Sequence, residues 1–279
     1  MNHYIIPIKN FKIYPYSKNF EYDFENPKVN LKYFAYEDDI ERIDADKYST
    51  CDHGILKMEY SWGLRFDCQN KDLDLYIEKI NLLMLSFRIF EEADCSFEYI
   101  LNVTDTYSSI KNPDRWKRSL NTVQHSSNFT IETLDKVKSG YSELQEFYYV
   151  SARTKHCIQF LYLAYISYYW MQAFILFMTA IETLVSPDIK SDKITSLIIN
   201  RILGLIANDS ICSKNQLNTL YELRSDIIHG KVITDIQLQK EMPKLVRLQK
   251  VVLTVFNNIL KRDFKTIYSN NIEFENFFN

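Results

Sequence analysis

The C-terminal half of the chain is dominated by apolar residues at helical spacing. The pattern predicts two buried helices over about 150–166 and 170–186, with a break near 167–169. Further helices are predicted over 132–149, about 213–229 and about 240–262, the last with Pro243 in its first turn. Another helix is predicted to start after Ser191, which would cap it. This half is therefore expected to be an all-α bundle.

The N-terminal half shows the shorter period that is typical of strands, and its apolar positions are β-branched or aromatic. The predicted strands are Tyr4–Ile8, Phe11–Tyr16, Val29–Tyr36, a hairpin of Gly54–Tyr60 and Gly63–Cys68 that turns at Ser61-Trp62, and Phe97–Val103. One amphipathic helix starts at Asp72, and residues 105–130 are expected to form a surface loop.

These patterns predict an α+β protein in three parts. Residues 1–130 are expected to form a mixed domain with an antiparallel sheet and one helix. Residues 131–149 form a connecting helix, and residues 150–279 form the helical domain.

The run from Cys157 to Ile181 has 25 residues without a formal charge, which is long enough for a membrane span. Its centre, residues 165–170, is rich in tyrosine, whereas aromatic residues in membrane helices gather at the two ends. We therefore expect two buried helices rather than a span.

Charge and cysteine content narrow the function classes. Residues 150–279 hold 15 Lys and Arg against 11 Asp and Glu, whereas residues 1–149 hold 18 against 25. This asymmetry is a mild indication of an anionic partner for the helical half. The five cysteines are scattered and form no C-x-x-C pair, and no secretory leader is evident, so we expect a reduced, cytoplasmic protein without a metal site.

Two charged residues interrupt apolar surfaces of the predicted helices. Arg224 lies on the line 217, 220, 224, 228, which is otherwise apolar, so it requires a carboxylate, a partner subunit or a ligand phosphate. Glu182 is the only formal charge between Lys155 and Asp188, and its carboxylate requires either a cationic partner or a proton taken up at an energetic cost. Arg224 and Arg201 are the two candidates. We expect the pair to lie at the buried base of the site, where removal of one partner, as in Glu182→Gln, should lower stability by about 3–5 kcal/mol.

The Arg224 helix also carries a sequence motif. Arg224 and His229 form an R-x4-H pattern followed by glycine, within the longer string Leu-Tyr-x-x-Arg-Ser-x-Ile-x-His-Gly. Together with the apolar run 174–184, this string resembles the signature of HEPN domains, especially the ApeA-like group of bacterial antiphage and toxin proteins. The resemblance covers roughly residues 150–262.

HEPN nucleases cleave RNA without a metal, at a site formed by two facing copies of this helix. The resemblance thus implies an endoribonuclease that acts as a homodimer, in antiphage defence, in abortive infection or as a toxin, with no cofactor. Arg224 would hold the scissile phosphate and His229 would transfer protons, while Ser225 and Asp226 match variable polar positions and Glu182 supports the site. A phage-derived or protein trigger is expected, and the N-terminal domain is the candidate sensor.

Two other interpretations stay open at this point. In the first, Arg224 and Glu182 form an ion pair with a purely structural role, and His229 is a histidine that the helix dipole stabilises at the C-terminus of its helix. Alternatively, the domain would bind RNA, a nucleotide or a protein partner without catalysis, as some HEPN domains do.

Overall fold

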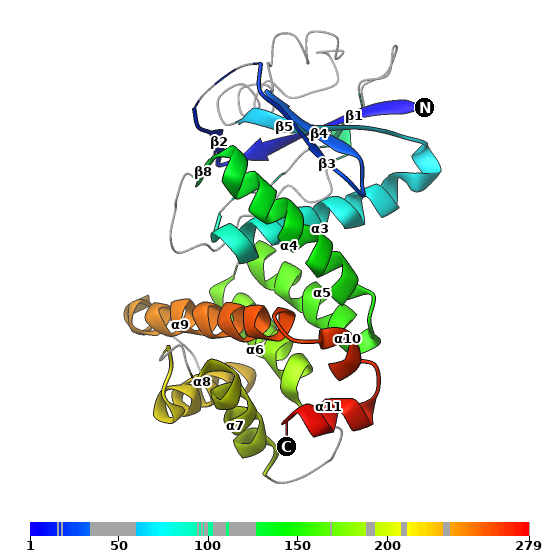
Figure 1. Ribbon diagram of the computed structural model, residues 1–279. Helices are drawn as coiled ribbons and strands as arrows, with labels where there is room; N and C mark the ends of the chain where they lie inside the picture. Colours follow the sequence, from blue (N-terminus) through cyan, green and yellow to red (C-terminus); the bar gives the residue numbers. More distant parts are fainter. Residues whose placement is uncertain are drawn as a thin grey trace. The chain divides into compact units, whose positions relative to one another are not determined.

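The structure of the protein is a computed structural model (Figure 1). It describes residues 1–15, 17, 19–33, 60–93, 95, 97, 100–102, 110–111, 127–167, 169–187, 193–207, 211–230 and 235–278. The chain divides into two compact units, Met1–Ser142 and Glu143–Asn279, and helix α4 (Ile131–Tyr148) crosses the boundary between them. Each unit is described by itself below.

The first unit is built on a six-stranded antiparallel sheet with the order β3-β4-β5-β1-β6-β7. The strands are β1 (Asn2–Lys9), β3 (Glu21–Phe24), β4 (Val29–Tyr33), β5 (Tyr60–Cys68), β6 (Ile100–Asn102) and β7 (Ile110–Lys111). A second, two-stranded sheet pairs β2 (Phe11–Ile13) with β8 (Ser127–Phe129) in parallel. Helix α3 (Leu73–Glu91) begins as predicted, directly after Asp72. An antiparallel sheet followed by a mostly helical region confirms the α+β class.

The central strand β5 corrects the predicted hairpin. It runs without a turn through Ser61-Trp62 and pairs with β1 from Cys68 opposite Asn2 to Tyr60 opposite Lys9. Trp62 is only 1% exposed, and its ring meets the rings of Phe20 and Tyr33. A buried indole stabilises a strand interior far more than an exposed turn, so core packing decided the conformation. The first half of the expected hairpin, 54–59, lies outside the described residues.

Two further differences concern weak local signals. Strand β3 was not predicted, because Glu21–Phe24 mixes acidic and aromatic residues and lies at a sheet edge. Short strands β7 and β8 lie inside the segment that was expected to be a loop. Strands this short depend on their pairing partners, which a local pattern does not reveal.

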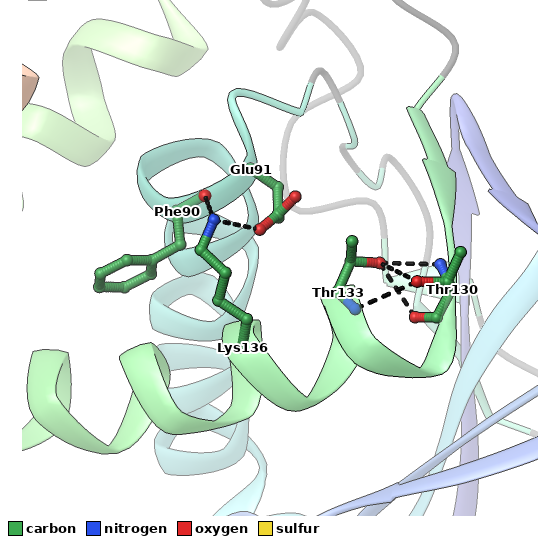
Figure 2. A network of polar contacts seen from close by, with 5 residues as sticks. All are labelled: Phe90, Glu91, Thr130, Thr133 and Lys136. Carbon is green, nitrogen blue, oxygen red and sulfur yellow. Dashed lines mark hydrogen bonds and ion pairs between the residues drawn. The ribbon is translucent and has the colours of Figure 1, made fainter.

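Within the first unit, α4 is tied to α3 by a small polar network (Figure 2). Lys136 reaches from α4 to the Glu91 carboxylate at 2.7 Å and donates to the Phe90 carbonyl at 2.9 Å. At the start of α4, the side chains of Thr130 and Thr133 bond to each other's backbone N–H groups. Lys136 thus joins α4 to the end of α3, and the two threonines cap the start of α4.

The second unit is helical. After the end of α4 come α5 (Ala152–Ile166), α6 (Trp170–Val185), α7 (Ile194–Ile206), α8 (Lys214–Ile228), α9 (Asp235–Leu260), α10 (Phe264–Ile267) and α11 (Asn271–Phe278). The break between α5 and α6 lies at 167–169 as predicted. Helix α6 packs against α5, α7, α8 and α9, so it is the central helix of this unit (Figure 1).

The structure corrects one helix start. Helix α9 begins at Asp235, so Pro243 lies inside the helix rather than in its first turn. Proline has no N–H to donate to the carbonyl four residues earlier, which normally disfavours an interior position. Burial of Leu245, Leu248 and Val252 further along α9 indicates that packing holds the helix through this residue. The predicted cap at Ser191 lies outside the described residues.

Among the helices that the structure describes, none is long and apolar enough to cross a membrane.

Candidate functional site

Helix α8 carries the R-x4-H motif, and both of its ends are determined by local chemistry. At its start, Gln216 N–H donates to the Ser213 hydroxyl at 3.3 Å, and the Ser213 N–H donates to the Gln216 side chain at 2.9 Å. This is the capping box that the sequence predicts. At its end, the His229 N–H donates to the Ser225 carbonyl at 2.9 Å, and Gly230 follows with φ +75°. Glycine adopts this left-handed conformation without strain.

Arg224 is anchored to the central helix by a carboxylate. Its Nη2 lies 3.3 Å from Oε2 of Glu182 on α6. Of the two arginines that the sequence offers to Glu182, the structure selects Arg224. The Arg224 side chain is 33% exposed and that of Glu182 is 19% exposed, so the pair is only partly buried. This exposure reduces the stabilisation expected from the pair to about 1 kcal/mol or less.

A tyrosine completes the group. Tyr221, one turn before Arg224 on α8, lies near the Glu182 carboxylate, but its buried hydroxyl has no partner with full hydrogen-bond geometry. Burial raises the pKa of the Glu182 carboxyl, and the nearby Arg224 charge and Tyr221 hydroxyl oppose that rise only in part. Burial, reinforced by the Glu182 charge, likewise raises the pKa of Tyr221. We call these three residues the Glu182 cluster.

The Arg224 guanidinium keeps donor capacity beyond the Glu182 contact. Its Nε is buried without a hydrogen-bond partner, and the contact to Glu182 uses one nitrogen and one oxygen. A guanidinium binds a carboxylate or phosphate best through two parallel hydrogen bonds. The arrangement therefore holds the cation in place without matching its full donor set.

The other predicted site residues lie on the last turns of α8. His229 and Ser225 are exposed, and Asp226 is half-buried. Ile228, beside His229, is 53% exposed. In the part of the chain that the structure describes, no hydrogen bond joins Arg224 to His229. On a helix, five residues correspond to about 140° around the axis, so the two side chains share an edge rather than a line.

Arg201, the alternative partner of Glu182, belongs to a different cluster. Its Nη1 donates to the Val185 carbonyl at 2.9 Å, and its Nη2 forms an ion pair with Glu275 on α11. Its guanidinium also lies over the ring of Phe278. The structural role of Glu275 was not predicted, because it contacts a residue 74 positions away.

Tyr221 was also missed as a site residue, although its spacing of three from Arg224 places it on the same face of α8. That spacing is the signal that the sequence offers for it.

Within the described residues, no three His, Cys, Asp or Glu side chains gather in a group that could hold a metal ion.

Comparisons of the chain with protein-family models, with curated proteins and with solved structures gave no match.

Proposed function

We propose that this protein is a metal-independent endoribonuclease of the HEPN type, with Arg224 as the phosphate-binding residue and His229 as the proton-transfer residue. The observation that supports this most is the end of α8, where an exposed imidazole follows, five residues further along the chain, a partly exposed guanidinium that a single Glu182 oxygen anchors. Such a pair supplies the two elements that metal-free RNA cleavage requires, a base and a cation.

The reaction proposed is internal transfer of the RNA phosphate. His229 removes the proton of the 2′-hydroxyl, the 2′-oxygen forms a bond to phosphorus, and the bond from phosphorus to the 5′-oxygen breaks. The leaving 5′-oxygen takes a proton from an acid. The products are a 2′,3′-cyclic phosphate and a free 5′-hydroxyl. Arg224 stabilises the charge that develops on the phosphate oxygens.

One histidine cannot act as base and acid in the same step, so we propose that a second copy of the chain supplies the second His229. In this dimer the exposed Ile228, next to His229, would lie where the two α8 ends meet. Glu182 anchors Arg224, and in this proposal Ser225 and Asp226 flank the phosphate on the same turns of α8.

The catalytic proposal is tested with purified protein, a single-stranded RNA and a structured RNA, in the presence of EDTA. We expect cleavage of at least one RNA, with 2′,3′-cyclic phosphate ends, and its loss in His229→Ala at unchanged melting temperature. His156→Ala is the matched control, since His156 is exposed on α5 and outside the site. Cleavage that disappears with EDTA and returns with magnesium would contradict the proposed mechanism.

The dimer is tested by sedimentation at micromolar concentration. Ile228→Glu should shift the protein toward monomer and reduce cleavage together, whereas Ile272→Glu, at an isoleucine that is 72% exposed on α11, should change neither. A wild-type protein that is strictly monomeric and still cleaves RNA would require another acid, such as Asp226 or a tyrosine.

The biological role proposed is antiphage defence, abortive infection or toxicity, with a phage-derived or protein trigger. Toxicity on expression that disappears in His229→Ala would support it. The alternative is a non-catalytic module that binds RNA, a nucleotide or a protein partner through the same guanidinium. RNA binding that depends on Arg224, without any cleavage, would favour that alternative.

A further inference from the structure

The last turn of α6 is bonded by side chains from three other parts of the second unit. A helix leaves its final carbonyls without intrahelical partners. Here they are bonded by side chains from other elements, two of which are arginines. Arg153 donates to the carbonyls of Thr183 and Ser186, Tyr268 to that of Leu184, and Arg201 to that of Val185.

These donors are themselves covered by helix α11. The Arg153 guanidinium lies 4.1 Å from the centre of the Phe274 ring, and the Arg201 guanidinium lies 4.8 Å from that of Phe278. Glu275 forms an ion pair with Arg201, whose side chain is only 3% exposed. Cations at a helix C-terminus are favoured by its dipole, and aromatic rings stabilise them further. Residues 264–278 therefore complete the end of α6.

Glu182 belongs to this same turn. Its carbonyl accepts the Ser186 N–H at 2.8 Å, and the Ser186 carbonyl is one of those that Arg153 holds. The side chain of Glu182, in contrast, pairs with Arg224 on α8. At 3.3 Å that contact is already long, so a shift of a few tenths of an ångström would take it beyond hydrogen-bond range.

We infer that the C-terminal segment 264–278 positions Glu182, and through it Arg224, by holding the last turn of α6. Glu275 and Arg201 are the positioning residues of this arrangement. A contact chain runs from Glu275 to Arg201, to the Val185 carbonyl, along one turn of α6 to Glu182, and then to Arg224. The inference does not depend on the ribonuclease proposal, because its tests measure hydrogen exchange and stability rather than RNA cleavage.

The test is hydrogen exchange of backbone amides, followed by mass spectrometry of the full chain. Glu275→Gln is the main variant, since it removes the charge while keeping the shape of the side chain. We expect exchange to accelerate about tenfold in the last turn of α6 and in residues 221–229 of α8, with little change in α9, because a charged hydrogen bond controls local opening of this order.

Glu146→Gln is the matched control. It removes the exposed ion pair of Glu146 with Lys265, which joins the same segment to α4 without involving the end of α6. It should leave the exchange of α6 and α8 unchanged. Arg201→Lys is a second variant, which keeps the charge but loses the planar contacts, and it should reproduce the Glu275→Gln pattern.

Three outcomes would overturn the inference: acceleration confined to α7 and α11, uniform acceleration through the unit, or the same pattern in Glu146→Gln. A double-mutant cycle of Glu275→Gln with Glu182→Gln gives an independent check. The two effects on the unfolding equilibrium constant should deviate from independence by a factor of about three or more. Independent effects would show that α11 does not act on Glu182.

Discussion

Two arginine–glutamate pairs in the described part of the helical unit differ in the burial of the arginine and in its other partners. Arg201 pairs with Glu275, and its side chain is 3% exposed. Arg224 pairs with Glu182, and its side chain is 33% exposed. In the first pair both terminal nitrogens of the arginine have protein partners, a carbonyl and a carboxylate. In the second, only one terminal nitrogen contacts the carboxylate.

The contrast shows how the same two residue types serve structure or chemistry. Arg201 lies against two aromatic rings and donates to a helix end, so its terminal nitrogens have partners within the fold, although its buried Nε, like that of Arg224, has no hydrogen-bond partner. Arg224 is held in place but reaches the surface, so its charge is available to an anion. Desolvation and hydrogen bonding, rather than the presence of a salt bridge, separate the two roles.

The largest expected effect is the loss of the Arg201–Glu275 pair, in which Arg201 is 3% and Glu275 31% exposed. Arg201→Met should lower the free energy of unfolding by about 1–3 kcal/mol, because the Val185 carbonyl loses its donor, whereas the Glu275 carboxylate is exposed enough to be hydrated. Arg224→Met, the matched substitution in the exposed pair, should lower it by about 1 kcal/mol or less. Denaturant unfolding of the two variants measures the difference. Equal losses of unfolding free energy in the two variants would show that the two ion pairs stabilise the fold equally, which would contradict this prediction.

A smaller effect concerns the charge of Glu182. Its pKa is raised in the folded protein, so the folded state binds this proton more tightly than the unfolded state does. The associated stability is present at low pH and is lost as pH rises from the ordinary value of 4.5 through the raised pKa. Glu182→Gln lacks this titration. Relative to the wild type, the variant should therefore gain stability as the pH rises above the ordinary value of 4.5.

Parallel denaturant titrations of wild type and Glu182→Gln across that range measure the change. A variant that instead falls behind as pH rises would show that the attraction of Arg224 outweighs burial. The sequence led us to expect that breaking the Glu182–Arg224 pair would lower the free energy of unfolding by about 3–5 kcal/mol. That figure applies to a fully buried pair, whereas these side chains are 19% and 33% exposed.

The smallest effect is expected at Tyr221. Its hydroxyl is buried without a full hydrogen bond, so Tyr221→Phe should change the free energy of unfolding by less than about 0.5 kcal/mol. The hydroxyl does oppose the rise in the pKa of Glu182, so the variant should raise that pKa further. An NMR titration of the Glu182 carboxyl carbon measures it. A large loss of stability would reveal a stronger bond between Tyr221 and Glu182 than the geometry indicates.

Local chemistry specifies much of the helical unit. The capping box of Ser213 and Gln216, the helix end at Gly230 and the break at 167–169 all depend on residues within about four positions of one another. Because side chains and backbone groups at that spacing meet in any helix, the sequence alone specifies such contacts.

Long-range packing determines the rest. The pattern left Glu182 with two candidate arginines, and only the packing of α6 against α8 selected Arg224. Trp62 lies in a strand because its side chain is buried in the core. Pro243 lies inside α9, although the local preference of proline is for the first turn of a helix. Glu275 reaches Arg201 across 74 positions. Contacts of this kind depend on how distant elements meet in space, because burial and partner choice are properties of the packed chain rather than of a local stretch.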